Sequence, residues 1–525
     1  ECSDYLWGLL FHGSAAEIKR ADEHFLKETG MKTYFGDLHD HCGITYGFGS
    51  LENAINRAKS QLDFSAFTGH AMWPDMYEKA PETEFVVNFH LEGFKKLRDH
   101  WEEVRQKVAE ANSPEFVTFQ GYELHSREYG DHHLLSIDDD LPLIYRNSPE
   151  ELVKGCGGHT IAIPHHIGYT PDYRGIDWDK YQEKISPVIE VYSKHGCAMS
   201  EDADYPYYHN MGPRDTRNMV DEGLRRGYHF GFVASTDHHA GFPGSYGDGL
   251  AAVVAEEKTR ESLWEAINAR RTYAVTGDKI LCDFKINDSW MGSEITGNKR
   301  KIHAHVETEG TLDKIILYKN LKPYHIINGE FYQKVNEEGC YKLRVEMGWG
   351  KSNLYHWNGN IRVEGGSIES YNTYFRGRSV LAPSADESYD ENSINDIETF
   401  SELKNSQEFA WRCDTVGNKS TLHPCTSSVV VKVKGDLNTQ ITYQLNNKTY
   451  TAAIKDLLAY GYTNHMEYYH SQAFKIYKAV PETRYTFDLD LEDINPENEW
   501  DVYHLEVAQK NRQWAYVSPI YVKKE

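Results

Sequence analysis

The sequence predicts an α/β fold for the first half of the chain and antiparallel β-structure for the second half. In residues 1–277, short apolar runs alternate with stretches of helical periodicity, which is the pattern of βα units built around a parallel sheet. In residues 278–525, apolar and polar residues alternate and turn residues separate the runs, as in antiparallel sheets. About seven βα units are predicted, and such units close into a barrel or form an open, doubly wound sheet.

The predicted strands of the first half are short, β-branched or aromatic runs. They lie at residues 33–38, 62–68, 116–124, 132–137, 160–166, 187–193 and 230–239. Two helices are predicted between the early strands. Ser50 suits the N-cap of a helix at residues 50–61. Apolar residues recur every three or four positions in a second helix, which is predicted to start near Leu91 and to end at Asn112–Pro114.

We interpret residues 278–525 as one or two β-sandwich units that pack against the first half. The predicted strands lie at residues 281–288, 300–310, 312–320, 427–436, 439–454, 500–509 and 513–522. Asn446–Asn447 is a predicted turn, and an irregular acidic loop is predicted at about residues 380–400. Selection of a substrate and contact between subunits are the alternative roles of this half.

The charge of the chain argues against two classes of partner. The net charge is −24, whereas binding to nucleic acid or to an anionic membrane surface requires a basic footprint. A small anionic substrate is compatible with this charge, because a bound metal ion can dominate the local field. No apolar run reaches the ~20 residues that a membrane-spanning helix needs.

The cysteines and the N-terminal residues bear on the compartment. The eight cysteines are scattered without a disulfide framework, and a Cys413–Cys425 pair is the less favoured alternative. The apolar run at residues 5–11 is too short for a signal peptide, so we expect a cytoplasmic protein. The chain does not begin with Met, so a trimmed leader stays open as an alternative, and so does a homo-oligomer.

Histidines and acids follow nearly every predicted strand of the first half. His39 and His41 are separated by one residue, so in an extended chain both imidazoles point to the same side. The other residues at strand ends are His70, Glu123, His125, His165, His166, Glu190, His195, Asp237, His238 and His239, whereas His132 and His133 open the strand at residues 132–137. Sites in parallel α/β folds form at the carboxyl ends of strands. Imidazoles together with carboxylates favour Zn, Mn or Fe.

The motifs "GDLHDH", "FTGH", "GYE", "IPHH" and "STDHH", in this order, resemble the polymerase and histidinol phosphatase (PHP) superfamily. The longer stretches "YFGDLHDHCGITYG", "LDFSAFTGH", "SKHG", "RRTYAVTGDKI" and "WAYVSPIYV" resemble the DUF3604 family of PHP-like proteins more closely. This resemblance implies a distorted (β/α)7 TIM-like barrel over residues 1–277. It also implies two divalent metal ions at the mouth of the barrel, with three as the alternative.

The resemblance assigns the metal ligands by motif. They are His39, His41, His70, Glu123, His165, Asp237 and His239. The chain departs from the superfamily pattern at Gly69, where an acid is usual, and at Cys42, where Thr is common. Because a further histidine shortly after His41 is also missing, two metal ions are preferred. His166 is the less likely alternative to its neighbour His165, and His195 and Glu190 are alternative ligands from the middle of the barrel.

The expected activity is hydrolysis by a metal-activated water, with a small or sugar-like phosphate ester as the favoured substrate. Asp237, His70 and His195 are the expected catalytic residues. Lys194, Arg174 and Arg214 are the candidate cations for a charged group of the substrate. The alternatives are hydrolysis of another ester, a lactone or an amide, and a non-catalytic binding protein that contains metal.

Overall fold

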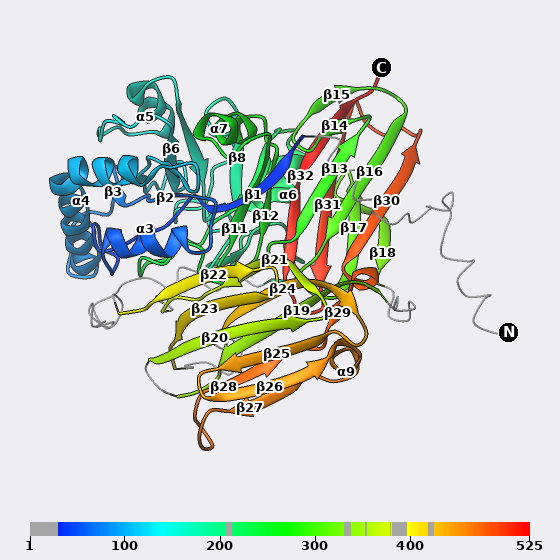
Figure 1. Cartoon of the computed structure of the whole chain (residues 1–525). Coiled ribbons are helices and arrows are strands. Elements are labelled where there is room, and N and C mark those ends of the chain that lie inside the picture. The colour runs from blue at the N-terminus through cyan, green and yellow to red at the C-terminus, as the bar shows by residue number, and fades with distance from the viewer. Residues whose placement is uncertain are drawn as a thin grey trace.

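The computed structural model describes residues 30–205, 213–329, 338–351, 354–378, 380, 396–417 and 425–525. Figure 1 shows a mixed α/β molecule with several sheets, as the sequence predicts: the helices lie on one side, long strands on the other, and a pair of sheets beneath both. Most of the predicted acidic loop and the apolar run at residues 5–11 lie outside the described residues.

The first half contains twelve strands and five α-helices in its described part. The strands are β1 (Lys32–Asp37), β2 (Phe64–Ala66), β3 (His70–Met72), β4 (Val117–Phe119), β5 (Glu123–Leu124), β6 (His132–Ser136), β7 (Thr160–Pro164), β8 (Val188–Ser193), β9 (Gly196–Cys197), β10 (Gly231–Ala234), β11 (Leu250–Ala255) and β12 (Thr272–Val275). The helices are α3 (Leu51–Lys59), α4 (Glu84–Ala111), α5 (Pro149–Cys156), α6 (Val220–Arg225) and α7 (Arg260–Asn268), with a 3-10 turn at Thr216–Asn218.

The two predicted helices form, and one begins earlier than predicted. The Ser50 side chain accepts a hydrogen bond from Asn53 N and caps α3, as expected. Helix α4 begins at Glu84 instead of near Leu91. Val87 extends the buried stripe of α4 by one turn, whereas Leu91 is half exposed and does not belong to that stripe.

The strands of the first half are only partly parallel. The pairs β1–β2, β2–β4, β3–β5 and β8–β10 are parallel, but β1–β11, β5–β6 and β6–β7 are antiparallel. The loop from β5 to β6 is too short for the crossover that a parallel pair needs, which explains the reversal there. These strands belong to three sheets, and closure of a barrel is not detected among the described residues.

One large sheet crosses from the first half into the second. Its strand order is β18-β17-β31-β32-β12-β11-β1-β2-β4, and β15 pairs with β32. A neighbouring sheet has the order β14-β13-β16-β30. The strands of these two sheets that follow residue 277 are β13 (Leu281–Ile286), β14 (Ser289–Trp290), β15 (Glu294–Thr296), β16 (Arg300–Glu307), β17 (Leu312–Lys319), β18 (Lys322–Asn328), β30 (Thr486–Asp493), β31 (Trp500–Gln509) and β32 (Trp514–Lys523).

Two further sheets pack across one core beneath this part, with buried Val345, Ile361 and Trp411 between them. Their orders are β21-β24-β19-β28-β27, with β29 beside β19, and β22-β23-β20-β25-β26. The elements are β19 (Glu338–Gly348), β20 (Tyr355–Glu364), β21 (Ser367–Tyr374), β22 (Thr399–Asn405), β23 (Glu408–Thr415), β24 (Ser427–Asp436), β25 (Gln440–Leu445), β26 (Lys448–Ala453), α9 (Ile454–Ala459), β27 (Tyr462–His465), β28 (Ala473–Ile476), β29 (Val480–Pro481) and a 3-10 turn at Glu482–Arg484.

Three smaller expectations concern a turn, a possible disulfide and membrane-spanning helices. Asn446 has a positive φ of 50° in the turn between β25 and β26, as predicted for this position. Cys413 is a free, buried thiol, so the alternative Cys413–Cys425 pair does not form. Within the described residues, no helix has both the length and the apolar character needed to span a membrane.

Candidate metal centre

Two buried carboxylates, Glu123 and Asp237, lie at the centre of a group of histidines. Glu123 is the first residue of β5, and Asp237 follows the end of β10. The group is formed by His39, His41, His70, Glu123, His125, His133, His165, His166, Glu190, His195, Asp237 and His239, each at most 7% exposed. So many buried polar groups at one place require partners, and these residues are one another's partners.

The two oxygens of Glu123 face different histidines. Oε2 lies 3.4 Å from His39 Nε2 and 3.3 Å from the Nε2 atoms of both His41 and His70. Oε1 lies 3.1 Å from His165 Nε2 and 3.2 Å from His125 Nδ1. The carboxylate therefore bridges two sets of imidazoles.

Asp237 forms a second bridge of the same kind. Its Oδ1 lies 3.0 Å from His41 Nε2 and 3.6 Å from His239 Nδ1. Its Oδ2 lies 2.7 Å from His195 Nε2 and 3.2 Å from His166 Nε2. Asp237 has a positive φ of 49°, a left-handed conformation that Asp tolerates better than most residues.

The ends of β1 and β10 hold Asp237 and the His39–His41 pair in register. Asp237 N donates to the backbone oxygen of His39 at 2.8 Å, and His41 N donates to that of His238 at 2.9 Å. Asp37 accepts from Thr236 N at 3.0 Å and from Gly244 N at 2.9 Å. This backbone network places the H-x-H segment beside Asp237.

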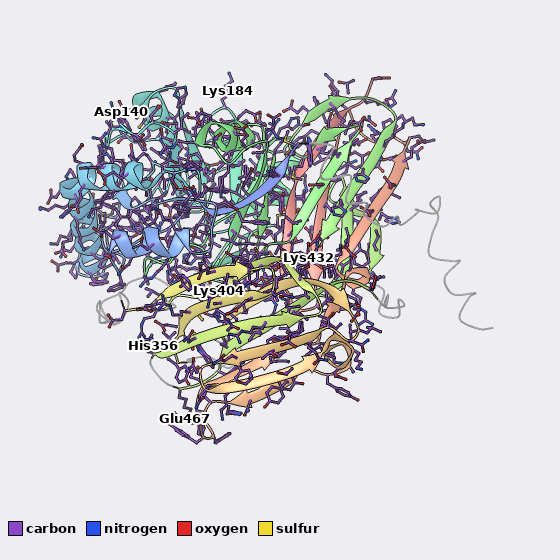
Figure 2. The ribbon with its side chains drawn as sticks, in the orientation of Figure 1. Asp140, Lys184, His356, Lys404, Lys432 and Glu467 are labelled. Carbon is purple, nitrogen blue, oxygen red and sulfur yellow. The ribbon has the colours of Figure 1, made fainter. Side chains whose placement is uncertain are left out.

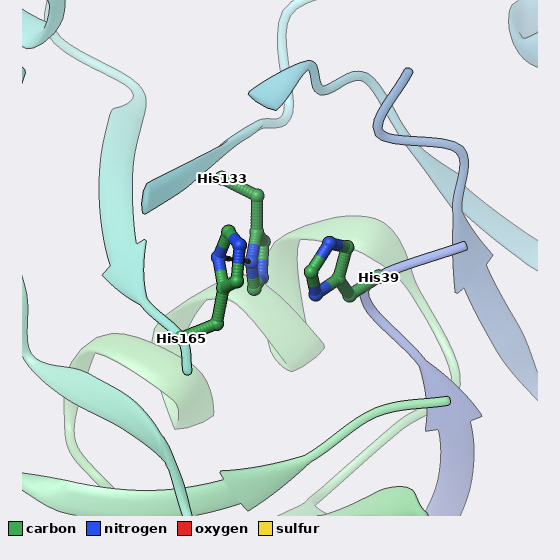
Figure 3. Close-up of side chains that lie close together, drawn as sticks. All are labelled: His39, His133 and His165. Atoms are coloured by element: carbon green, nitrogen blue, oxygen red, sulfur yellow. Dashed lines mark hydrogen bonds between the residues drawn. The ribbon is translucent and has the colours of Figure 1, made fainter. Parts of the chain in front are cut away.

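Some ring nitrogens face each other at hydrogen-bond distance. His39 Nε2 lies 3.1 Å from His41 Nε2, and His133 Nδ1 lies 3.3 Å from His165 Nδ1. Figure 3 shows the rings of His39, His133 and His165 converging from three separate segments. The ligand atoms of these three residues lie within 4.8 Å of one another, and so do those of the set His41, His70 and His239. Nitrogen lone pairs that converge in this way fit a shared cation.

The protonation states of the side chains in this group also suit the binding of a metal cation. Burial lowers the pKa of His41 to about 4, and it lowers the pKa of His70 and His239 well below the usual value, so these imidazoles are neutral near pH 7. Burial alone would raise the pKa values of Glu123 and Asp237, but the surrounding imidazoles hold both values well below the ordinary range. Neutral imidazoles and ionised carboxylates are the forms that bind metal.

His39 is held in place by Glu190 of β8. His39 Nδ1 lies 3.0 Å from Glu190 Oε2, while His39 Nε2 faces Glu123 and His41. Burial opposes a charge on His39, yet the charges of Asp237 and Glu190 outweigh burial and raise the pKa of His39 well above its usual value. A carboxylate behind the second nitrogen fixes the ring and its tautomer, which is the usual support of a metal-binding histidine.

The structure brings together all seven residues that the sequence assigned to metal binding, together with His195. Lys194 Nζ lies 2.7 Å from His239 Nδ1, at the edge of the group. Arg174 lies in the wall, where it pairs with Asp131 at 2.5 Å and is 3.9 Å from Glu123 Oε1. Arg214 is elsewhere, and its guanidinium donates to backbone oxygens of Ser200 and Glu201.

The sequence assignment did not include His125 and His133 as ligands or supports, and it gave His166 only as the less likely neighbour of His165. It also left out Asp131, which lies beside the group with its Oδ2 atom 3.2 Å from His125 Nδ1. His133 lies at the beginning of β6, not at its end, and enters the centre because β6 runs antiparallel to β5 and β7. The doublets His132–His133 and His165–His166 were the sequence signal for these additional histidines. Which histidine of each doublet points into the centre depends on the direction of its strand, which the sequence did not give. At Gly69, a Cβ atom would lie 3.0 Å from Leu97 Cδ1, which leaves little room for the acid expected there.

Residues 245–310 match the family model described as "Protein of unknown function (DUF3604)". The resemblance to DUF3604 that the motifs indicated is therefore confirmed. The matched segment follows Asp237 and His239 in the chain and does not include the residues of the metal centre.

Three relatives come from chlamydiae, and each is described as an uncharacterized protein. The protein of Chlamydia pneumoniae is 29% identical over 61% of this chain and 48% of its own length. That of Chlamydia muridarum is 30% identical over 51% of this chain and 43% of its own length, and that of Chlamydia trachomatis is 28% identical over the same shares. This chain therefore spans a little less than half the length of these relatives.

A solved structure from Bacteroides vulgatus is similar to this chain. It is described as a two-domain protein containing a predicted PHP-like metal-dependent phosphoesterase. The match covers 84% of this chain and 99% of that chain, with 13% sequence identity and a TM-score of 0.31. A TM-score of this size supports no conclusion about fold or activity.

Proposed function

We propose that this chain, which matches the DUF3604 family over residues 245–310, is a metal-dependent hydrolase that acts on phosphate esters. The observation that carries the proposal is the pair of bridging carboxylates, Glu123 and Asp237, each buried between two sets of imidazoles. Two metal ions that share carboxylates suit phosphoester hydrolysis, because they can act on both the attacking and the leaving oxygen.

The ligand sets follow from which donor atoms lie together. One ion would be held by His41, His70 and His239, and the other by His39, His133 and His165. Glu123 would serve both sets, since its oxygens face residues of each. The ligand types fit Zn, Mn or Fe. Asp131, His165 and His166 form a further group that would allow the alternative of a third ion.

The residues around the two sets have separate tasks in this proposal. The bound ions would supply a water molecule of lowered pKa and positive charge opposite the developing negative charge. Asp237 would accept the proton of that water, and His195, 2.7 Å from Asp237 Oδ2, would orient the carboxylate. Lys194 would face the anionic group of the substrate. Tyr46 stacks on His70 with ring centroids 3.6 Å apart, which holds the His70 ring and keeps water away from that side.

We further propose that the first half is the distorted (β/α)7 barrel implied by its family resemblance. Backbone contacts between neighbouring strands support this proposal, because they form a nearly continuous ring. An isolated bridge between Gln120 and Ser136 joins the end of β4 to β6, and a bridge between Asp40 and His238 joins the ends of β1 and β10. Ala162 N of β7 donates to Ile185 O shortly before β8 at 2.8 Å. This proposal includes a boundary at residue 277 between the barrel and the β-rich second half.

The test combines metal analysis with turnover of an aryl phosphate. We expect the purified chain to contain a divalent metal and to hydrolyse 4-nitrophenyl phosphate. Glu123→Gln keeps the side-chain volume but removes the bridging charge, so bound metal should be lost and kcat/KM should fall at least about 100-fold. Glu115→Gln, at an exposed position, is the matched control and should change neither quantity.

Three outcomes would count against the proposal in different ways. A normally folded protein that binds no divalent metal would contradict the metal centre itself. A protein that contains metal but hydrolyses aryl acetates and not aryl phosphates would favour the alternative of another ester, lactone or amide substrate. Metal without turnover of either kind of substrate would favour a binding protein.

A further inference from the structure

A cleft of about 1790 Å³ lies between the metal centre, the lower pair of sheets and the turn between β31 and β32. Its described lining includes Tyr192, Ser245–Asp248, the region of Glu309, the end of β28 and Gln509–Trp514. Pockets for small ligands usually measure about 300–1,000 Å³. The cleft therefore has room for a ligand larger than a simple monophosphate.

The charge of this cleft is opposite to the charge of the chain. Among the described residues, its cations are Lys194, Lys342, Arg344, Lys351, Arg376, Arg378, Lys475, Lys478, Arg484, Lys510 and Arg512, and its acids are Asp204, Asp248, Glu309, Asp313 and Glu346. Cations outnumber acids by six in the lining, whereas the whole chain has a net charge of −24. Cations gathered inside a concave surface raise the local concentration of anions.

The acids of the cleft are already engaged. Glu309 pairs with Lys342 at 2.8 Å, and Asp313 pairs with Lys510. Glu346 accepts hydrogen bonds from the hydroxyls of Thr426 and Tyr477. These pairs neutralise Lys342 and Lys510, and Asp278 behind the lining pairs with Arg344, so the positive excess comes from the other cations of the cleft.

Three exposed cations stand on three separate segments of the lining. Lys351 follows β19, Lys478 follows β28, and Arg512 lies in the turn between β31 and β32. The free energy of folding does not favour cations gathered on one concave surface, because like charges repel. An anionic ligand in the cleft would offset this repulsion.

The cleft extends to the edge of the metal centre. Lys194 and His238 line it, and Lys194 Nζ lies 2.7 Å from His239 Nδ1. A Cβ atom at Gly377 would lie 2.9 Å from His238 Cε1, so residues 376–378 pass closely over this histidine. An anionic group at Lys194 would thus be next to the metal ligands, while other groups of the same molecule lie along the cleft.

We propose that the cleft binds a small substrate with several phosphate groups, one of which reaches the metal centre at Lys194. This inference deepens the proposed function and rests on it for the identity of the reacting group. Lys351, Lys478 and Arg512 hold the phosphates that do not react. The substrate class is therefore a multiply phosphorylated small molecule, and a monophosphate binds weakly.

The test uses the full chain and inorganic tripolyphosphate as the probe, with orthophosphate for comparison. We expect tripolyphosphate to bind at least about tenfold more tightly than orthophosphate in calorimetry. The triple variant Lys351→Glu, Lys478→Glu, Arg512→Glu should lose that advantage. Lys184→Glu is the matched control, because Figure 2 shows Lys184 projecting from the outer edge of the first half, and its binding should be unchanged. Any chelation of metal by the probe affects every variant equally.

The single variants Lys478→Glu and Arg512→Glu keep the test decisive if the triple variant does not fold, and each should weaken binding in the same direction. Equal binding of tripolyphosphate by cleft variants and control would overturn the inference. Tighter binding of a short single-stranded DNA than of tripolyphosphate would also overturn it. Asp237→Asn separates the two proposals: if the chain proves to have no phosphatase activity, this variant and the parent can still show the cleft-dependent binding.

Discussion

At the scale of single residues, the side chain that holds a metal-binding residue in place matters as much as the metal-binding residue itself. His39 has one nitrogen toward Glu123 and His41 and the other toward Glu190, 3.0 Å away. Glu190 itself lies in the middle of β8, where strand hydrogen bonds fix its backbone. The carboxylate therefore holds the imidazole in the orientation that metal binding needs.

Glu190→Gln tests this role. Gln can still accept a hydrogen bond from His39 Nδ1, but it no longer supplies the negative charge that makes the imidazole a better ligand. We expect the affinity for divalent metal to fall about 10–100-fold with the fold retained. Competition with a chromophoric chelator measures the affinity, and Glu92→Gln, at an exposed position of α4, is the control. Unchanged affinity would mean that Glu190 only fills space.

At the scale of elements, the sequence predicted the residues at strand ends better than the directions of the strands. The positions of His39, His70 and Asp237 followed from apolar runs that end in a polar residue, a local signal. His133 could not be assigned in this way, because β6 is antiparallel to both of its neighbours and brings its first residues to the centre. Strand direction depends on pairing between distant segments, which a local pattern does not contain.

A second element, β16, supports a prediction of pH dependence. On the face of the β13–β16–β30 sheet, His305 lies between Asp283 and Asp488 in the strand register, and its Nδ1 is 2.7 Å from Asp488 Oδ1. Burial would lower the pKa of His305, but the hydrogen bond and charge of Asp488, with the charges of Asp283 and Glu307, raise it above the usual value of 6.5. The charged form is therefore favoured by folding.

The direction of the pH dependence follows from the raised pKa of His305. A group whose pKa is higher in the folded state stabilises the protein fully below its unfolded pKa and loses this contribution as pH rises through the folded pKa. His305→Gln should therefore lower the free energy of unfolding by about 1 kcal/mol at about pH 6 and by less at about pH 9. Urea unfolding at both pH values measures the difference. Asp488→Asn should flatten the same pH dependence, and a His305→Gln effect that grows with pH would contradict the assignment.

At the scale of the whole molecule, the two halves of the sequence share one sheet. β12 pairs with β32, which joins Tyr273 to Val517 across the sheet. A core cluster also combines Phe232 of β10 with Trp514 and Tyr516 of β32. The sequence pattern changes near residue 277, but this local change could not show that the last strand of the chain returns to pair with the first half.

This return leads to a prediction about residues 30–277 expressed alone. Without β32, the edge of β12 would expose unpaired backbone groups, and the apolar faces of Phe232 and Ala274 would lose Tyr516 and its neighbours. We expect the fragment to aggregate or to unfold without a cooperative transition, and to bind divalent metal much more weakly than the full chain. Circular dichroism during thermal unfolding and metal titration measure both properties. A fragment that unfolds cooperatively and keeps its metal would show that the first half is an independent domain, and β32 would then be an addition to a complete fold and not a part of its core.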